Sequence, residues 1–361
     1  MGKLKLYTDA RLDLLRKRGD DLADRLVVFL IQNPEWIERI NSWEQIPAVQ
    51  EVSDFPKLVK EYFLFFHSKP DFIDLTKTAA AQDFFQKNSN LYLSLLGFYS
   101  LPYCYAFADG AQVLVRSKRI TEEIGVRLSE TALFLLDAFF PGTFMNNDEK
   151  LMTLAKVRLI HAFSRYFVSR HARDWDDDWG IPINQEDLVG TNLAFSLMVM
   201  RGMEKLDRFP GKDSLEDLLH YWKLIGFYLG LEIDYWPETA KEAFELEKLI
   251  RKRHLKPSEA GRILMDSLLR YYKTSIPDTA ITSVMDQFIG YFLGKEASAA
   301  LGILAVGKLP KQVYGLVLDF SFWKQGRTHS GYGGLRRDLK QRFKSEFGRD
   351  LVLNLPIPKR S

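Results

Sequence analysis

Apolar residues recur at the three- and four-residue spacing of an amphipathic helix along most of the chain, whereas alternating, strand-like runs are scarce. We therefore expect an all-α fold, with helix ends set by capping residues, prolines and glycines. The spacing predicts helices over 21–32, 55–66, 121–139, from about 148 through His161, from Asn184 through Met203, and over 214–229, 237–254, 258–272 and 282–292.

No internal repeat or flexible linker divides these helices. We expect one large helical domain over residues 81–320, with amino-terminal helices of residues 1–80 packed on it. Residues 321–361 look like a polar tail, and the glycine-rich stretch 326–334 within them is typical of a surface loop, because no strand or nucleotide-binding spacing accompanies it.

One uncharged run, residues 88–108, approaches the length of a membrane span. It contains Gly97, Pro102, several polar groups and four tyrosines, which favour a buried helix broken near Leu101. We therefore expect no transmembrane span, while peripheral contact with a membrane surface stays open.

Composition narrows the class of protein. With 46% apolar and 13% aromatic residues, the 361-residue chain can bury a large core. A net charge of +3, with the basic residues scattered, gives no support to nucleic-acid binding. The single cysteine, Cys104, excludes an internal disulfide, and the charged amino terminus shows no export signal, so we expect a cytoplasmic protein with an inert thiol.

The most informative candidate for chemistry is His161, which stands between Arg158 and Arg165 in an apolar run. On a helix these three side chains share one face, since residues three and four apart are neighbours. A neutral imidazole is a good ligand for a transition metal or a haem iron, and the arginines need anionic partners, either protein carboxylates or carboxylates of a cofactor. A core histidine beside structural salt bridges is the alternative.

Two further segments favour a metal or haem ligand over a structural role for His161. On the preceding helix Arg127, Glu130 and Thr131 also share one face. After the His161 helix comes the sequence Trp-Gly-Ile-Pro-Ile-Asn-Gln-Glu-Asp, which begins at Trp179 and leads to Thr191. The intervening run of three aspartates, 176–178, looks like a metal cluster, but consecutive carboxylates cannot all converge on one ion, so a solvated loop is favoured.

Together these segments, over residues 109–272, resemble the oxygenase family that includes latex-clearing proteins, which cleave rubber, and the MpaB-type oxygenases of mycophenolic acid biosynthesis. The resemblance implies a helical, globin-like core that binds one b-type haem, with His161 as the axial iron ligand. It also implies that Arg158 and Arg165 contact the haem propionates or hold the histidine helix. Arg127 and Thr131 would then lie on the distal side of the haem or at its edge.

The same resemblance implies a cofactor contact for Thr191 and a catalytic role for the Arg127, Glu130 and Thr131 face. Latex-clearing proteins carry a lysine beside the matching threonine, and this chain has Glu130 there, which puts distal lysine ligation in doubt. The acidic residue proposed as their catalytic base has no clear counterpart, and Asp109 and Glu130 are the candidates.

The function implied is a haem b-dependent oxygenase that uses O2 on the double bond of a hydrophobic, isoprenoid-like or unsaturated lipid substrate. An apolar, aromatic-rich helical pocket suits such a substrate. Because no export signal is visible, a small intracellular terpenoid fits better than rubber. The alternatives are a non-catalytic haem-binding sensor or carrier, and a purely structural helical protein.

Overall fold

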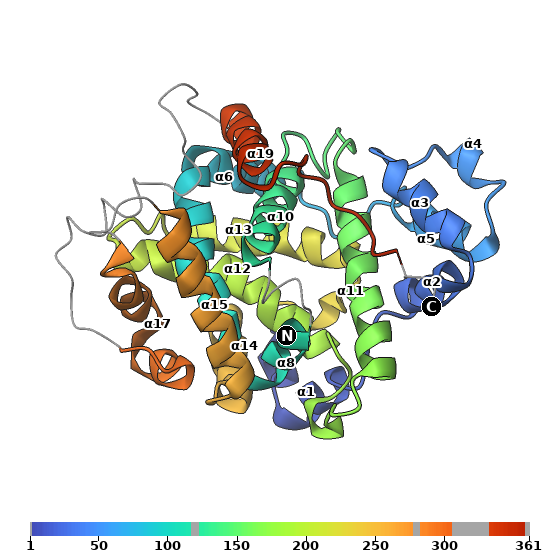
Figure 1. Cartoon of the computed structure of the whole chain (residues 1–361). Coiled ribbons are helices and arrows are strands. Elements are labelled where there is room, and N and C mark those ends of the chain that lie inside the picture. Colours follow the sequence, from blue (N-terminus) through green and yellow to red (C-terminus); the bar gives the residue numbers. More distant parts are fainter. Residues whose placement is uncertain (1, 117–122, 277–281, 305–331, 358–361) are drawn as a thin grey trace.

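The computed structural model confirms the all-α prediction: the described residues 2–116, 123–276, 282–304 and 332–357 form helices and no named strand (Figure 1). The α-helices are α1 (Asp9–Leu15), α2 (Asp21–Gln32), α3 (Pro34–Ser42), α4 (Val49–Val52), α5 (Lys57–Phe65), α6 (Leu75–Leu95), α7 (Leu101–Tyr105), α8 (Ala108–Arg116), α10 (Ile124–Ala138), α11 (Leu151–His171), α12 (Gln185–Lys205), α13 (Lys212–Tyr228), α14 (Ala240–His254), α15 (Glu259–Ser275), α17 (Met285–Leu301) and α19 (Tyr332–Phe347). Short 3₁₀-helices cover Lys3–Leu6, Asp177–Trp179 and Ile233–Tyr235.

Local capping explains where several helices begin. Asp20 and Asn184 accept hydrogen bonds from the first turns of α2 and α12, and Thr239 forms a reciprocal capping box at the start of α14. This cap starts α14 after Thr239, later than the predicted residue 237. Thr121, the start of the helix predicted over 121–139, lies outside the described residues, and α10 is described from Ile124.

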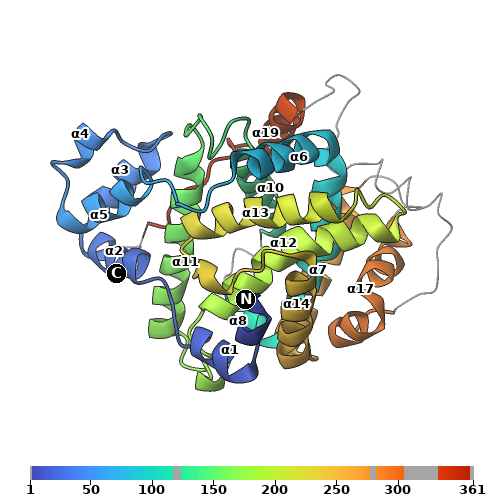
Figure 2. The same cartoon turned by 180° about the vertical axis from the view of Figure 1, so that it is seen from behind.

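The helices are arranged around a central group formed by α10, α11, α12 and α13. Both views show α2 to α5 as a lobe at one end, beyond α11, and α17 at the opposite end (Figures 1 and 2). α2 packs on α11, α13 packs on both α6 and α12, and α8 packs on α15. The amino-terminal helices therefore support α11, the helix that carries His161, from its outer side.

The uncharged run is buried and interrupted as expected. It spans the end of α6, a π-helical turn over Leu96–Ser100 and the short helix α7, with Pro102 near its start. A π-turn locally breaks the regular hydrogen-bond ladder, so the three pieces form a bent path through the core. Among the described residues, no helix is both long enough and apolar enough to cross a membrane.

The carboxyl-terminal residues differ from the expected polar tail. Leu335, Leu339 and Phe343 recur every four residues on α19 and are buried, and Arg336 Nε lies 2.8 Å from Asp137 Oδ1 on α10. The charged residues between them raise the average polarity of this segment, so its composition alone predicts a polar tail although one face of the helix is apolar. Most of the glycine-rich stretch 326–334 lies outside the described residues.

Candidate functional site

A cavity of about 510 Å³ lies where α7, α8, α10, α11, α12 and α14 meet. Its lining is mainly apolar and aromatic and includes Leu101, Tyr105, Phe107, Val113, Leu114, Phe134, Val157, Ile160, Phe163, Phe167, Leu188, Phe195, Trp222, Leu229 and Ile250. Cys104 also lines it, and burial raises the pKa of this thiol to about 12, so the sulfur is protonated at neutral pH. The cavity suits a hydrophobic guest of small-molecule size.

His161 lies near the middle of α11 and lines this cavity. Burial, followed by the charges of Arg165 and Arg127, lowers the pKa of its imidazole to about 3, so the ring is neutral at pH 7. Its Nδ1 atom is buried and has no hydrogen-bond partner among the described residues. Buried histidines that serve only packing normally satisfy their ring nitrogens, so this one is available as a ligand.

The predicted catalytic face of α10 borders the same cavity. Arg127, Glu130 and Thr131 all line it, and Arg127 Nη1 donates to Glu130 Oε2 over 3.1 Å. Glu130 is buried, and the Thr131 hydroxyl donates to the Arg127 carbonyl oxygen at 2.9 Å. Thr191 on α12 lines the cavity too. The structure therefore brings these four residues together with His161, while their chemical roles stay predictions.

Arg158 and Arg165 pair with carboxylates at the start of α2 and are not part of the cavity lining. Arg158 donates from Nε and Nη2 to the two carboxylate oxygens of Asp20, at 2.6 and 2.7 Å, and Arg165 donates from Nε to Asp24 Oδ1 at 2.7 Å. Both carboxylates belong to the start of α2, and neither arginine lines the cavity. Of the two kinds of partner that the sequence left open, the structure shows protein carboxylates, which fasten α11 to α2.

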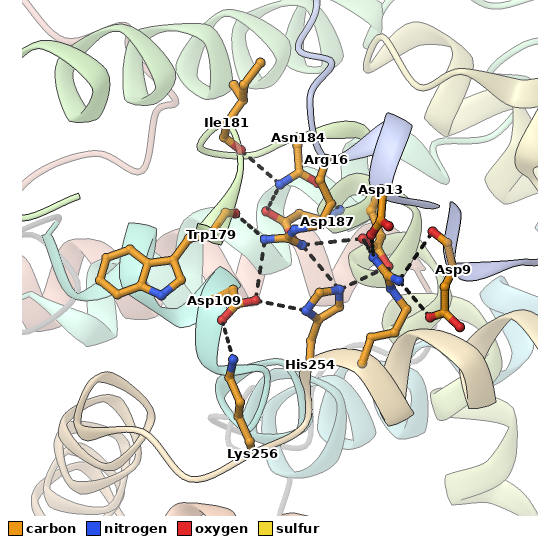
Figure 3. Close-up of polar contacts among 12 residues, drawn as sticks. Asp9, Asp13, Arg16, Asp109, Trp179, Ile181, Asn184, Asp187, His254 and Lys256 are labelled. Atoms are coloured by element: carbon orange, nitrogen blue, oxygen red, sulfur yellow. Dashed lines mark hydrogen bonds and ion pairs between the residues drawn. The ribbon is translucent and has the colours of Figure 1, made fainter. Parts of the chain in front are cut away.

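A buried charge cluster, which the sequence did not reveal, borders another part of the cavity (Figure 3). Its centre is His254 at the end of α14, with Nδ1 3.0 Å from Asp109 Oδ2 and Nε2 3.1 Å from Glu186 Oε1. Arg16, from the end of α1, lies 3.4 Å from Asp187 Oδ1 and 3.6 Å from Asp109 Oδ2. Four segments that are distant in sequence therefore share one ionic network.

The electrostatics of this cluster favour a charged His254. Burial alone would lower the pKa of this imidazole, but the hydrogen bonds to Asp109 and Glu186 outweigh burial and hold the pKa above its usual value. Asp187 behaves differently, because burial raises the pKa of its carboxyl to about 6 even though Arg16 opposes that shift. Glu186, Asp187 and His254 all line the cavity, so the cluster forms a second polar region in a mainly apolar cavity.

The sequence contained only a faint signal for this cluster. Asp109 is a candidate catalytic base in the sequence, and Asp187 is the last residue of the motif that begins at Trp179. Two adjacent acids, Glu186 and Asp187, at the start of an otherwise apolar helix are the one local hint of a buried partner. Arg16 could not be assigned from sequence, because it is more than 90 residues away from every carboxylate that it contacts.

Comparisons with known proteins give matches to a family of oxygenases. The profile of the family described as "ER-bound oxygenase mpaB/B'/Rubber oxygenase, catalytic domain" matches residues 105–317. The rubber oxygenase of Streptomyces sp. (strain K30) is 25% identical over 181 residues, which cover 49% of this chain and 44% of that protein. The match therefore spans less than half of that relative.

The fold is also shared with a solved structure. The latex clearing protein LCP in its closed state superposes with a TM-score of 0.70 and 19% identity, and the match covers 94% of each chain. The family profile includes all the predicted site residues from Arg127 to Thr191 and the cluster residues Asp109 to His254. The profile covers more than half of the chain, and the chain belongs to the family of MpaB and rubber oxygenase catalytic domains.

Proposed function

We propose that this protein is a haem b-dependent oxygenase that uses O2 on the double bond of a small hydrophobic alkene. The observation that carries the proposal is His161, a neutral and unpartnered histidine on the wall of an apolar cavity in a chain of the oxygenase family. The rubber oxygenase relative supports an alkene as the substrate class. The substrate and the cofactor are both parts of this proposal.

The residues present fit a haem. The cavity volume lies within the range of cofactor pockets, and its apolar wall suits a porphyrin. The buried Nδ1 of His161 has no hydrogen-bond partner among the described residues, so no protein contact fixes this ring in a purely structural role. Two arginines, Arg116 and Arg127, line the cavity and would pair with the propionates, whereas Arg158 and Arg165 do not line it.

Arg116 is held in place by its surroundings. Its guanidinium donates to Gln112 and Asp174 and lies over the rings of Trp175 and Trp179, with 5.6 and 5.2 Å to the ring centroids. These contacts fix the side chain before any ligand arrives, and a preorganised cation loses little conformational entropy on binding an anion. Arg127 is similarly fixed by Glu130.

A bound haem would supply the activation of O2, with His161 as its protein ligand. The protein supplies the environment. Apolar side chains exclude water and hold the alkene by contact, and the protonated Cys104 adds no charge. The Thr131 hydroxyl already donates to Arg127, so its oxygen is left as an acceptor towards a guest, while Glu130 and Arg127 present an ion pair on the same side.

The proposal is tested in two steps on the purified protein. An ultraviolet-visible spectrum with a Soret band shows haem, and its absence after reconstitution with haem would contradict the cofactor assignment. Oxygen uptake with a panel of terpenoid and fatty alkenes then tests turnover. A haem-loaded protein that consumes no O2 with any of them would support a haem-binding sensor or carrier, the alternative that the closed Arg127–Glu130 pair favours.

A further inference from the structure

The last described residues form an extended segment, 349–357, which we call the C-terminal strap. Buried and exposed side chains alternate along it: Leu351, Leu353 and Leu355 are buried, whereas Val352 and Asn354 are exposed. Period-two alternation is typical of an extended chain with one face on a surface. The strap follows α19 and lies outside the residues that the family profile matches.

The strap is fastened near both of its ends. At its start Lys344 and Asp350 form an ion pair, and α19 itself is packed on α10. At its far end Leu355 is clamped by Asn41 of α3, whose Oδ1 accepts from the Leu355 amide at 2.7 Å and whose Nδ2 donates to the Leu355 carbonyl at 3.1 Å. Figure 1 shows the strap passing from α19 across α11 towards the amino-terminal lobe.

Two residues of the strap are part of the cavity wall. Leu353 and Pro356 line the cavity, and every other described residue of the lining lies between Leu101 and His254. The strap is held there by three buried leucines and by exposed ion pairs of Arg349 with Glu123 and of Asp350 with Lys344. Among the described residues, its backbone hydrogen bonds are those of Leu355 to Asn41. It therefore closes one side of the chamber with few directional contacts.

The clamp is also tied to the helix that carries His161. Lys156 on α11 donates from Nζ to the backbone oxygens of Asn41 and Trp43, at 2.9 and 3.0 Å. Lys156 is buried, and this burial lowers the pKa of its ammonium group to about 8. Asn41 thus joins the strap and α11 at one point.

We propose that the C-terminal strap limits the size of the substrate, with Leu353 and Pro356 as specificity-determining residues. This inference rests on the proposed function and narrows its substrate class to compact alkenes whose length the strap limits, as opposed to a polymer chain that must pass through the cavity. An apolar wall excludes a longer guest by contact, and one methylene group more or less changes binding roughly 10- to 200-fold in such pockets.

Binding of a length series tests the strap without requiring turnover. Nile red bound to the purified full-length chain is displaced with geraniol, farnesol and geranylgeraniol, which grow by one isoprene unit at each step. For the unmodified chain we expect affinity to fall at the longest alcohol. Leu353→Ala enlarges the wall and Asn41→Ala releases the clamp, so each should raise the relative affinity for geranylgeraniol roughly tenfold.

Val352→Ala is the matched control, because Val352 neighbours Leu353 but is exposed. It should leave the length profile unchanged, whereas Leu353→Phe should shift the limit towards geraniol. The proposal would be overturned if affinity changed along the alcohol series in the same way in the unmodified chain and in Asn41→Ala, Leu353→Ala and Leu353→Phe. Circular dichroism verifies that each variant is folded. A missing Soret band or absent O2 uptake would overturn the proposed function instead, and the length profile would still decide the strap.

Discussion

Two histidines border the same cavity and have opposite environments. His161 has no hydrogen-bond partner for its buried Nδ1 among the described residues, and its pKa is lowered to about 3. His254 has a carboxylate at each ring nitrogen, Asp109 and Glu186, and its pKa is raised. Burial acts in the same direction on both imidazoles, so the difference comes from the neighbouring charges.

This difference distinguishes a histidine that can bind a metal from a histidine that is a structural hub, meaning one whose charge holds several carboxylates together. A metal ligand must be neutral and must keep a nitrogen lone pair available, which suits His161. A charged imidazole between carboxylates has no free lone pair and instead compensates buried negative charge, which suits His254. Being a cavity-lining histidine is thus not enough to mark an iron ligand; the surrounding charges decide.

The sharpest test of the comparison is His161→Ala. We expect complete loss of the Soret band with the helical fold intact, because the proposed iron ligand is gone and the removed ring leaves only a larger cavity. The stability of the haem-free protein should change by about 1 kcal/mol or less. Absorption spectra and urea unfolding measure the two effects, and Ser164→Ala, on the same cavity wall, is the control that should keep the band.

Restoring a Soret band in His161→Gly with added imidazole would show ligation directly. An unchanged band and unchanged iron ligation in His161→Ala would contradict the assignment.

His254→Ala should have the opposite pattern, a large loss of stability with haem retained. Removing the imidazolium leaves Asp109 and Glu186 without a central counter-charge, and breaking a buried ion pair costs about 3 to 5 kcal/mol. The free energy of unfolding in urea measures the loss. His171→Ala, at the exposed end of α11, is the control and should stay within about 0.5 kcal/mol. A loss below about 1 kcal/mol for His254→Ala would show that His254 is not a hub.

Asp187 gives the cluster a pH dependence with a defined sign. Its pKa of about 6 lies above its ordinary value of 3.8, so folding favours the protonated carboxyl. This contribution is fully present below about pH 4 and is lost as the pH rises through 6. Asp187→Asn removes it, so the variant should gain up to about 3 kcal/mol relative to the unmodified protein between pH 4 and 7.

Urea unfolding of both proteins across this pH range measures the difference. The control has the opposite sign: hydrogen bonds to His254 and Arg253 overcome burial and lower the pKa of Glu186, so its contribution is lost as the pH falls. The unmodified protein should therefore lose stability relative to Glu186→Gln on acidification. A flat difference for Asp187→Asn would show that this carboxyl is solvated.

Local signals account for what the sequence predicted. The range of α2 agreed with its prediction because Asp20 caps its start and Asn33 precedes a proline at its end. His161 was found because a helix places its neighbours in sequence on one face. Both inferences need contacts only a few residues apart, which the sequence alone contains.

Long-range pairing explains what the sequence did not reveal. Arg158 is 138 residues from its partner Asp20. The sequence could therefore predict that Arg158 has a buried anionic partner, but not which residue that partner is. The His254 cluster joins α1, α8, α12 and α14, and no single segment shows it. The strap was read as part of a polar tail because three alternating leucines are too short a pattern to predict what they pack on.

The smallest expected effect concerns the arginines that flank His161. Arg165→Ala should lower the free energy of unfolding by about 1 to 2 kcal/mol, because Asp24, its half-exposed partner, regains water when the pair is lost. Haem affinity, measured by titrating the haem-free protein, should stay within about twofold. Arg116→Ala is the contrasting variant, since Arg116 lines the cavity, and it should weaken haem binding while sparing stability. If Arg165→Ala weakened haem binding tenfold or more, Arg165 would contact a propionate in the loaded protein, as the sequence resemblance implies.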